Sequence, residues 1–199
     1  MDYKYKALIF DLDGVLIDSE DLRMNTYKEL FKSNFNIEIK VHKPDFHGKS
    51  EESNLNLILN KYSLEADIND LIDKRKILLN NLAKNKIKFN VPIINLLILA
   101  NNMKLATAIC TNSHKEYLQI ILDRLSGVAK IDVCLTREDI VHSKPDPEIY
   151  YKASSILSVK PENCLVFEDS KPGQEAAKKA NMDVIIVPED VGSSFIVMG

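Results

Sequence analysis

The 199-residue sequence contains few cysteines: Cys110, Cys134 and Cys164. Their number is odd and none are spaced as CxxC, so the sequence indicates neither a disulfide framework nor a cysteine metal site. Each lies in an apolar, strand-like run, where we expect it to be a small buried hydrophobic side chain. The four histidines form no cluster with metal-ligand spacing, and we expect His42, His114 and His142 at the surface.

Long apolar runs and blocks of like charge are also absent. No run approaches the ~18 residues of a membrane span, and the first apolar stretch is too short for a signal peptide. The net charge is -3 and the two signs are interspersed, which provides no footprint for nucleic acid or an anionic membrane. We therefore expect a cytoplasmic protein that binds neither and is a monomer or a weak homodimer.

Apolar residues make up 45% of the sequence, which is enough for a substantial core. Short apolar runs alternate with segments of helical periodicity, and this pattern predicts an α/β fold with a doubly wound parallel sheet. Ser113 and Glu116 are spaced as a capping box and predict the start of one of the helices. The expected strands are 6–10, 104–110, 132–135, 164–167 and 184–187.

A helical block interrupts the alternation after the first strand. Apolar positions at helical spacing predict three helices, which begin near Asp18, Ser50 and Ile68. We therefore expect a catalytic core of residues 1–17 plus 89–199 and an inserted helical cap of residues 18–88.

Polar side chains follow several of the predicted strands. Because ligands bind outside the carboxyl ends of parallel strands, we expect these side chains to converge on one crevice. They are Asp11 and Asp13 after the first strand, Thr111 and Asn112 after the second, Lys144 on the loop after the third, and Glu168 and Asp169 after the fourth.

This set of groups suits phosphoryl transfer. Several carboxylates in one site repel one another and favour a cation, and oxygen ligands at this density point to Mg²⁺. A hydroxyl, backbone amides at a helix start and one lysine form a cradle for a phosphate. One aspartate can attack phosphorus as a nucleophile, while a second carboxylate protonates the leaving oxygen and later activates water.

Four ordered motifs carry a family resemblance that spans nearly the whole chain. The sequences DLDGV from Asp11, TNS from Thr111, SKPDP from Ser143 and FEDS from Phe167 resemble the motifs of the haloacid dehalogenase superfamily. Within it, the chain resembles the branch with a helical cap inserted after the first motif. That branch holds beta-phosphoglucomutase and many small sugar-phosphate phosphatases.

The resemblance implies a role for each motif residue. Asp11 would be the nucleophile, and Asp13, which true dehalogenases lack, the general acid and base. Thr111 and the Asn112 backbone would bind phosphate, and Lys144 would balance charge. Mg²⁺ would be held by the Asp11 carboxylate, the Asp13 carbonyl oxygen and Asp169, with Glu168 as a direct ligand or a partner through water.

The cap is expected to select the substrate because it closes over the crevice. The candidate loop is residues 46–51, and the candidate substrate contacts are His47, Lys49 and Arg23. Mutase-like members tend to carry a histidine where this chain has Arg23 and an arginine near Glu51. Both departures weaken the mutase interpretation, because a mutase needs a second phosphate clamp in the cap. Lys49 or Arg23 could still supply that clamp.

The leading hypothesis is a Mg²⁺-dependent phosphatase that acts on a small phosphorylated metabolite, most simply a sugar phosphate. The alternative is a phosphosugar mutase, and a non-catalytic phosphometabolite sensor is more remote. A receiver-type phosphoacceptor domain is excluded, because it lacks a helical insertion of ~70 residues and does not carry its acceptor on the first strand.

Overall fold

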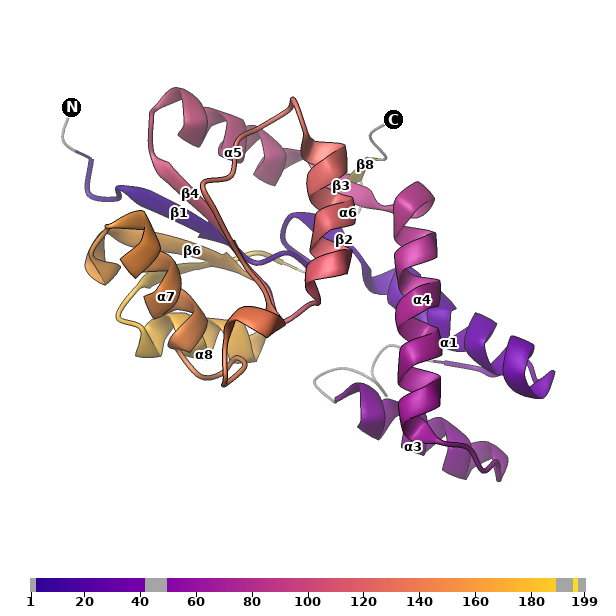
Figure 1. The fold of residues 1–199 in the computed structure, drawn as a ribbon. Helices are drawn as coiled ribbons and strands as arrows, with labels where there is room; N and C mark the ends of the chain where they lie inside the picture. Colours follow the sequence, from indigo (N-terminus) through magenta and orange to yellow (C-terminus); the bar gives the residue numbers. More distant parts are fainter. Residues whose placement is uncertain (1–2, 42–49, 189–194, 197–199) are drawn as a thin grey trace. The chain divides into compact units, whose positions relative to one another are not determined.

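The computed structural model describes residues 3–41, 50–188 and 195–196 (Figure 1). The chain divides into two compact units. One comprises Met1–Ser19 with Ile87–Gly199, and the other is Glu20–Lys86. In the part of the chain that the structure describes, no helix is both long and apolar enough to cross a membrane.

The first unit is built on a parallel five-stranded sheet with strand order β5-β4-β1-β6-β7. The central strand β1 (Ala7–Phe10) is buried along its whole length, as its unbroken apolar run predicts. Its first residue pairs with Ala106 on one side and Cys164 on the other. The other strands are β4 (Ala106–Cys110), β5 (Val133–Leu135), β6 (Cys164–Glu168) and β7 (Asp183–Ile186). The predicted fold class is confirmed.

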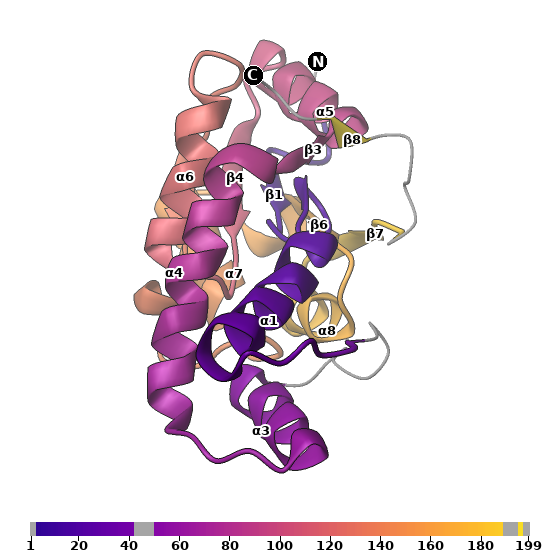
Figure 2. The ribbon, with the colours of Figure 1, turned by 90° about the vertical axis from the view of Figure 1, so that its right-hand side faces the viewer.

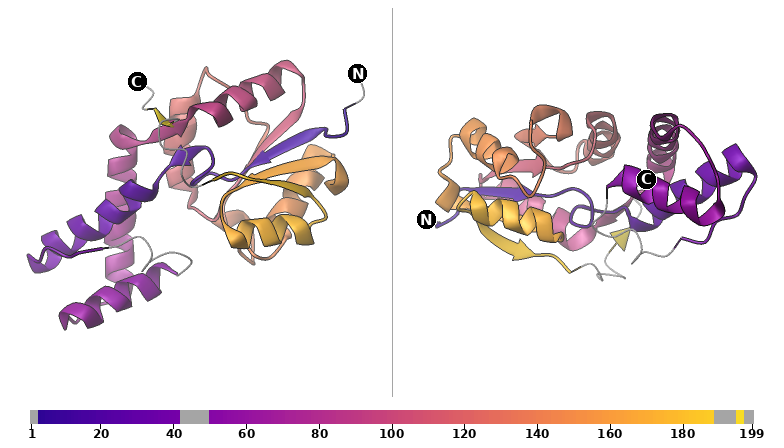
Figure 3. Two further views of the ribbon diagram at one scale, coloured as in Figure 1. Left: turned by 180° about the vertical axis from the view of Figure 1, so that it is seen from behind. Right: turned by 90° about the horizontal axis from the view of Figure 1, so that it is seen from below.

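Helices cover both faces of this sheet (Figures 1 and 3). On one face lie α5 (Val91–Asn102) and α6 (Lys115–Leu125), and on the other α7 (Glu148–Leu157) and α8 (Lys171–Lys179). Short 3-10 turns, η1 (Arg137–Asp139) and η2 (Pro161–Asn163), lie before α7 and β6. Alternate strand residues such as Ala7 and Ile9 join Tyr150 of α7 and Ala176 of α8 in one apolar core. Cys110 and Cys164 lie in that core, as expected, while Cys134 is half-buried.

A second, antiparallel sheet was not predicted from the sequence. It contains β2 (Ile17–Asp18), β3 (Lys88–Asn90) and β8 (Phe195–Ile196), in the order β2-β3-β8. Strands of two or three residues are too short to display an alternating pattern, so periodicity cannot predict them. Since β2 precedes the helical insertion and β3 follows it, their pairing brings the two ends of the insertion together.

The second unit consists, among its described residues, of α1 (Glu20–Phe35), α3 (Glu51–Tyr62) and α4 (Ile68–Lys86). Figure 2 shows α1 alongside α4, and α4 also packs against α3. Their apolar faces form a separate core. The start of α3 agrees with the prediction: Ser50 is the N-cap, its hydroxyl accepts the N–H of Ser53, and Glu51 lies in the first turn.

Candidate active site

The candidate site in the first unit begins at the end of β1. Asp11 is the residue after this strand, and its backbone N–H donates to the carbonyl of Phe167 at 3.0 Å. Because β1 lies between β4 and β6, the residues that follow all three strands meet at one edge. The Asp11 carboxylate is thereby buried between segments that are far apart in sequence.

Lys144 reaches this edge from the loop before α7 and joins three segments. Its ammonium nitrogen donates to Asp11 Oδ1 at 2.5 Å, to Glu168 Oε1 at 2.7 Å and to the carbonyl of Cys110 at 2.8 Å. An ammonium group has three hydrogens, so these bonds use its full capacity. The buried Lys144 charge is therefore fixed between the two carboxylates and at the end of β4.

Glu168 is wholly buried, and both of its oxygens are engaged. Oε1 accepts from Lys144 and, at 3.1 Å, from the hydroxyl of Tyr150. Oε2 accepts from the N–H of Ser170 at 3.0 Å and from the Ser170 hydroxyl at 2.9 Å. These contacts favour a role in orienting Lys144 over direct metal ligation.

Two glycines leave room for the acidic side chains. A Cβ on Gly173, in the first turn of α8, would lie 1.7 Å from Glu168 Oε1. A Cβ on Gly14 would lie 2.0 Å from Asp169 Oδ2, and the φ of Gly14 is +82°, which also favours glycine. The absence of side chains at both positions thus allows the two carboxylates of the fourth motif to approach the neighbouring backbone.

The electrostatics of the cluster are dominated by burial and by excess negative charge. Burial raises the pKa of Asp11 well above its ordinary value, Lys144 opposes this change, and Glu168 and Asp169 add to it. Burial, followed by the charge of Glu168, raises the pKa of Asp169 to about 7. Burial lowers the pKa of Lys144, but Asp11 and Glu168 outweigh it, so its pKa lies well above the ordinary value and the ammonium stays charged.

Asp11 and Asp169 could hold a divalent cation, with Glu168 beside them. Carboxylate oxygens of Asp11, Glu168 and Asp169 lie within 4.8 Å of one another. Three carboxylates share a single ammonium here, so a bound cation would offset the remaining negative charge and restore the ionised form of Asp169. An all-oxygen donor set is the kind that Mg²⁺ prefers.

Asp13, two residues beyond Asp11, is held from the segment after β4. The Ser113 hydroxyl donates to Asp13 Oδ2 at 2.6 Å, and the Tyr117 hydroxyl lies 3.5 Å from Oδ1. The predicted capping box of Ser113 and Glu116 is wrong: α6 has His114 as its N-cap, without a side-chain cap bond. The Ser113 hydroxyl is engaged by Asp13 instead.

Thr111 and Asn112 occupy the turn between β4 and α6. Thr111 is buried, and its hydroxyl oxygen accepts the N–H of Ser113 at 3.0 Å. Asn112 is exposed, and its side-chain oxygen lies 3.4 Å from the backbone nitrogen of Lys144, which donates to it. The turn is thus linked to the loop that carries the lysine.

The three predicted substrate contacts, Arg23, His47 and Lys49, belong to the second unit and not to the unit that contains the candidate site. Arg23 is a half-buried residue of α1 in the second unit. His47 and Lys49 lie outside the described residues, as does His42. The other two histidines are exposed, as expected: 49% of the His114 side chain and 71% of the His142 side chain are accessible.

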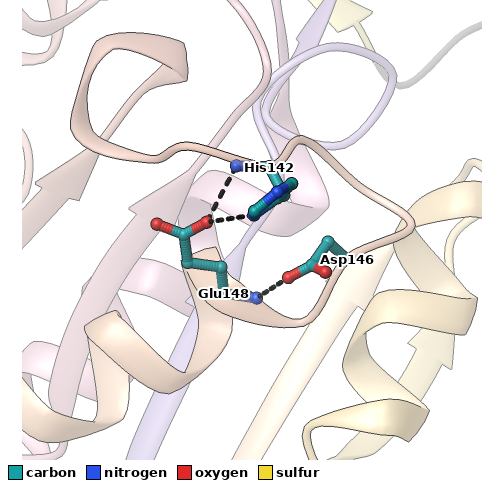
Figure 4. A group of neighbouring side chains, drawn as sticks. All are labelled: His142, Asp146 and Glu148. Atoms are coloured by element: carbon teal, nitrogen blue, oxygen red, sulfur yellow. Dashed lines mark hydrogen bonds and ion pairs between the residues drawn. The ribbon is translucent and has the colours of Figure 1, made fainter.

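His142, Asp146 and Glu148 form a second cluster on the loop around Lys144 (Figure 4). The Glu148 carboxylate accepts the N–H groups of Val141 and His142, which lower its pKa, and the N–H of Glu148 donates to Asp146 at 2.9 Å. Every one of these bonds joins the loop to Glu148, the first residue of α7. These bonds explain why the three side chains lie together: they hold in place the segment that carries Lys144.

The contacts of three residues that hold the site were not predicted from the sequence: those of Ser113, which was expected to be a helix cap, and those of Tyr150 and Gly173. Tyr150 is on the buried face of α7, where its periodicity suggests packing alone. Gly173 follows Ser170 at the spacing of a helix N-cap and N3, and the Ser170 hydroxyl accepts its N–H at 3.1 Å. That spacing could have indicated the position of Gly173 at the start of a helix. Nothing in the sequence indicates that the hydroxyl of Tyr150 donates to Glu168.

Comparisons with known proteins identify the family of the chain. The family model for haloacid dehalogenase-like hydrolases matches residues 8–187. A phosphorylated carbohydrates phosphatase from Thermotoga maritima is 31% identical over 188 residues, which cover 90% of this chain and 83% of the relative. Validoxylamine A 7'-phosphate phosphatase from Streptomyces hygroscopicus subsp. limoneus is 27% identical over 190 residues, with coverage of 89% and 83%.

A solved structure extends the agreement to the fold. The HAD hydrolase, family IA, variant 3 from Entamoeba histolytica HM-1:IMSS superimposes with a TM-score of 0.79 at 26% identity, over 94% of this chain and 85% of that one. Since the family model spans most of the chain and the sheet carries all four motifs at one edge, this protein is an enzyme that belongs to the haloacid dehalogenase-like hydrolases.

Proposed function

We propose that the protein is a Mg²⁺-dependent phosphatase that hydrolyses a phosphorylated carbohydrate through an aspartyl-phosphate intermediate. The observation that carries the proposal is the set of bonds from Lys144 to Asp11, Glu168 and the Cys110 carbonyl. One of the relatives named above is a phosphorylated carbohydrates phosphatase, which supports this substrate class, and the other is a validoxylamine A 7'-phosphate phosphatase.

In the first step, the Asp11 carboxylate attacks phosphorus while the bond to the leaving oxygen breaks. Lys144 engages Oδ1 of Asp11, so we assign the attack to Oδ2. The lysine also offsets charge as the phosphoryl group approaches a buried carboxylate. Asp13, oriented by Ser113, gives its proton to the leaving alcohol.

In the second step, water replaces Asp11 at phosphorus. Asp13, now ionised, takes a proton from this water, and the acyl phosphate is cleaved to free carboxylate and phosphate. Thr111 binds the phosphoryl oxygens: its hydroxyl oxygen accepts from Ser113, and among the described residues no acceptor takes its hydrogen, which can therefore donate to the phosphate. The backbone of Asn112 lies at the start of α6 and is assigned to the same task.

The metal would be held by Asp11, the carbonyl oxygen of Asp13 and Asp169, with Glu168 outside the direct ligand set. When bound, Mg²⁺ supplies charge neutralisation for the phosphoryl group. Glu168 is excluded from direct ligation in this proposal because Lys144, Tyr150 and Ser170 already engage its oxygens. Arg23, His47 and Lys49 remain predictions for contacts with the leaving group.

The test is the release of phosphate from 4-nitrophenyl phosphate with and without Mg²⁺. We expect Mg²⁺-dependent activity in the unaltered protein and a loss of at least a thousandfold in Asp11→Asn, because an amide cannot replace the nucleophile. Asp123→Asn, an exposed position on α6, is the matched control and should keep full activity. Activity that survives Asp11→Asn would refute the assignment of the nucleophile.

A further inference from the structure

Tyr150 carries a hydroxyl group that the core of the first unit does not need for packing. The side chain lies on the buried face of α7, is fully buried and belongs to the same apolar core as Ala7 and Ile9 of β1. A phenylalanine would fill the same space, and a buried hydroxyl costs free energy unless a partner satisfies it. The partner is Glu168, whose Oε1 accepts the hydroxyl hydrogen at 3.1 Å.

The oxygen that Tyr150 binds is the one that holds Lys144. Oε1 of Glu168 also accepts from the Lys144 ammonium at 2.7 Å, so the tyrosine and the lysine meet on a single oxygen atom. The aromatic ring adds a second contact, because the ammonium nitrogen lies 5.1 Å from the ring centre. Burial raises the pKa of Tyr150 well above its ordinary value, so the hydroxyl keeps its hydrogen and acts as a donor. Tyr150 thus contacts both members of a buried ion pair.

Three acceptors determine where the Lys144 ammonium lies, and they are held to different degrees. The carbonyl of Cys110 belongs to the last residue of β4 and is fixed by the sheet. The second acceptor, Asp11, is the proposed nucleophile and changes its charge during the reaction. The third, Glu168, is a side chain with several rotatable bonds, so its position depends on the groups that bind it. From α7, the Tyr150 hydroxyl binds the glutamate oxygen that faces the lysine.

We propose that Tyr150 is a positioning residue: through Glu168 it keeps the Lys144 ammonium on one oxygen of the nucleophile. This inference rests on the proposed function and deepens it. The oxygen held by the lysine is Oδ1 of Asp11, which leaves Oδ2 to attack phosphorus. When Asp11 becomes an acyl phosphate and loses its charge, the lysine keeps its place, because Glu168 and the Cys110 carbonyl remain its acceptors.

Tyr150→Phe tests the hydroxyl alone, because it keeps the ring beside the ammonium and the volume of the core. We expect kcat and kcat/KM for 4-nitrophenyl phosphate to fall together about tenfold, with KM nearly unchanged, since a misplaced nucleophile slows the attack and leaves substrate binding intact. The assay is run below the onset of thermal unfolding of each variant. A loss of stability alone then leaves kcat unchanged.

Tyr151→Phe is the matched control. Tyr151 is the next residue of α7, is partly exposed, and its hydroxyl donates to the carbonyl of Lys179 at 2.9 Å. The control therefore removes the same group from the same helix, away from the ion pair. It should keep the kcat and KM of the unaltered protein.

A second measurement follows Lys144 without turnover. The ammonium group is buried and donates three hydrogen bonds, so its hydrogens should exchange slowly with water and give a proton–nitrogen NMR signal in the presence of a chelator. The signal is identified by its loss in Lys144→Arg. We expect Tyr150→Phe to shift this signal and to raise the exchange rate of the hydrogens about tenfold, the loss of one hydrogen bond to the charged pair. Tyr151→Phe should leave it unchanged.

A tenfold lower kcat together with an altered ammonium signal supports the inference. A folded Tyr150→Phe protein with unchanged kcat or an unchanged Lys144 signal would overturn it, as would an equal loss of kcat in Tyr151→Phe. If Tyr150→Phe does not fold, the unaltered protein decides: slow exchange at Lys144 supports the inference, and exchange as fast as that of exposed lysines overturns it. If the unaltered protein releases no phosphate from any ester, the proposed function fails, while the Lys144 signal still tests whether Tyr150 holds the lysine in place.

Discussion

Asp169→Asn should stabilise the metal-free protein at alkaline pH, although it removes a residue of the candidate active site. Burial of the Asp169 carboxylate, together with the nearby charge of Glu168, raises its pKa from 3.8 to about 7. Because the pKa in the folded state lies above that in the unfolded chain, ionisation of Asp169 costs the folded state free energy as the pH rises from about 4 to about 7. Above pH 7 the cost is constant, and below pH 4 it disappears.

The size of the effect follows from the change in pKa. A rise from 3.8 to about 7 is equivalent to about 4 kcal/mol as an upper bound. Because the side chain is partly exposed and an asparagine forms weaker hydrogen bonds, we expect a gain of about 1–3 kcal/mol in the free energy of unfolding at pH 8.

The assay is urea denaturation in the presence of a chelator, at pH 4 and pH 8, with Asp123→Asn as the exposed control. The difference between the Asp169 variant and the unaltered protein should be near zero at pH 4 and largest at pH 8. A substitution that destabilises the protein equally at both pH values would refute the idea that the carboxylate is held under electrostatic strain. Added Mg²⁺ should stabilise the unaltered protein at pH 8 and have little effect on the variant.

Three further substitutions test the packing of the site. Gly173→Ala should destabilise the protein by about 2–4 kcal/mol in urea denaturation, because the new Cβ would lie 1.7 Å from the buried Glu168 carboxylate; a change below about 0.5 kcal/mol would contradict the described contact. Tyr150→Phe removes one donor from Glu168 without opening a cavity, and should lower the melting temperature through a loss of about 1–2 kcal/mol; unchanged stability would show that the bond contributes nothing. Gly14→Ala should reduce hydrolysis of 4-nitrophenyl phosphate at least tenfold, since its Cβ would displace Asp169 Oδ2 and its φ of +82° disfavours alanine; full activity would contradict that geometry.

The sheet and the motif residues could be predicted because their signals are local. A buried strand that ends in acidic or hydroxyl residues is visible within about ten positions, and the edge of a parallel sheet then brings such ends together. This reasoning correctly grouped Asp11, Lys144 and Glu168. It required no knowledge of which side chains would hold them in place.

The remaining features depend on long-range contacts that local patterns do not encode. Ser113 resembles a helix cap in sequence, but its hydroxyl donates to Asp13, which is 100 positions away. The pairing of Arg75 with Glu51 joins two helices across 24 positions, and a lone arginine in a charged helix is ordinarily solvated. The small β2-β3-β8 sheet escapes prediction for another reason, because its strands are shorter than any detectable period.

The central place of β1 in the sheet imposes an order of assembly on the growing chain. Of the strands β1, β4 and β6, β1 is synthesised before the other two, and its partners begin only at Ala106 and Cys164. The helical insertion Glu20–Lys86 can form before the apolar strand β1 is paired, because helices depend mainly on local contacts. The strand that precedes Asp11, the proposed nucleophile, therefore stays an exposed hydrophobic segment until these partners have been made, and a nascent chain that ends before β6 should be a target for chaperones and proteases.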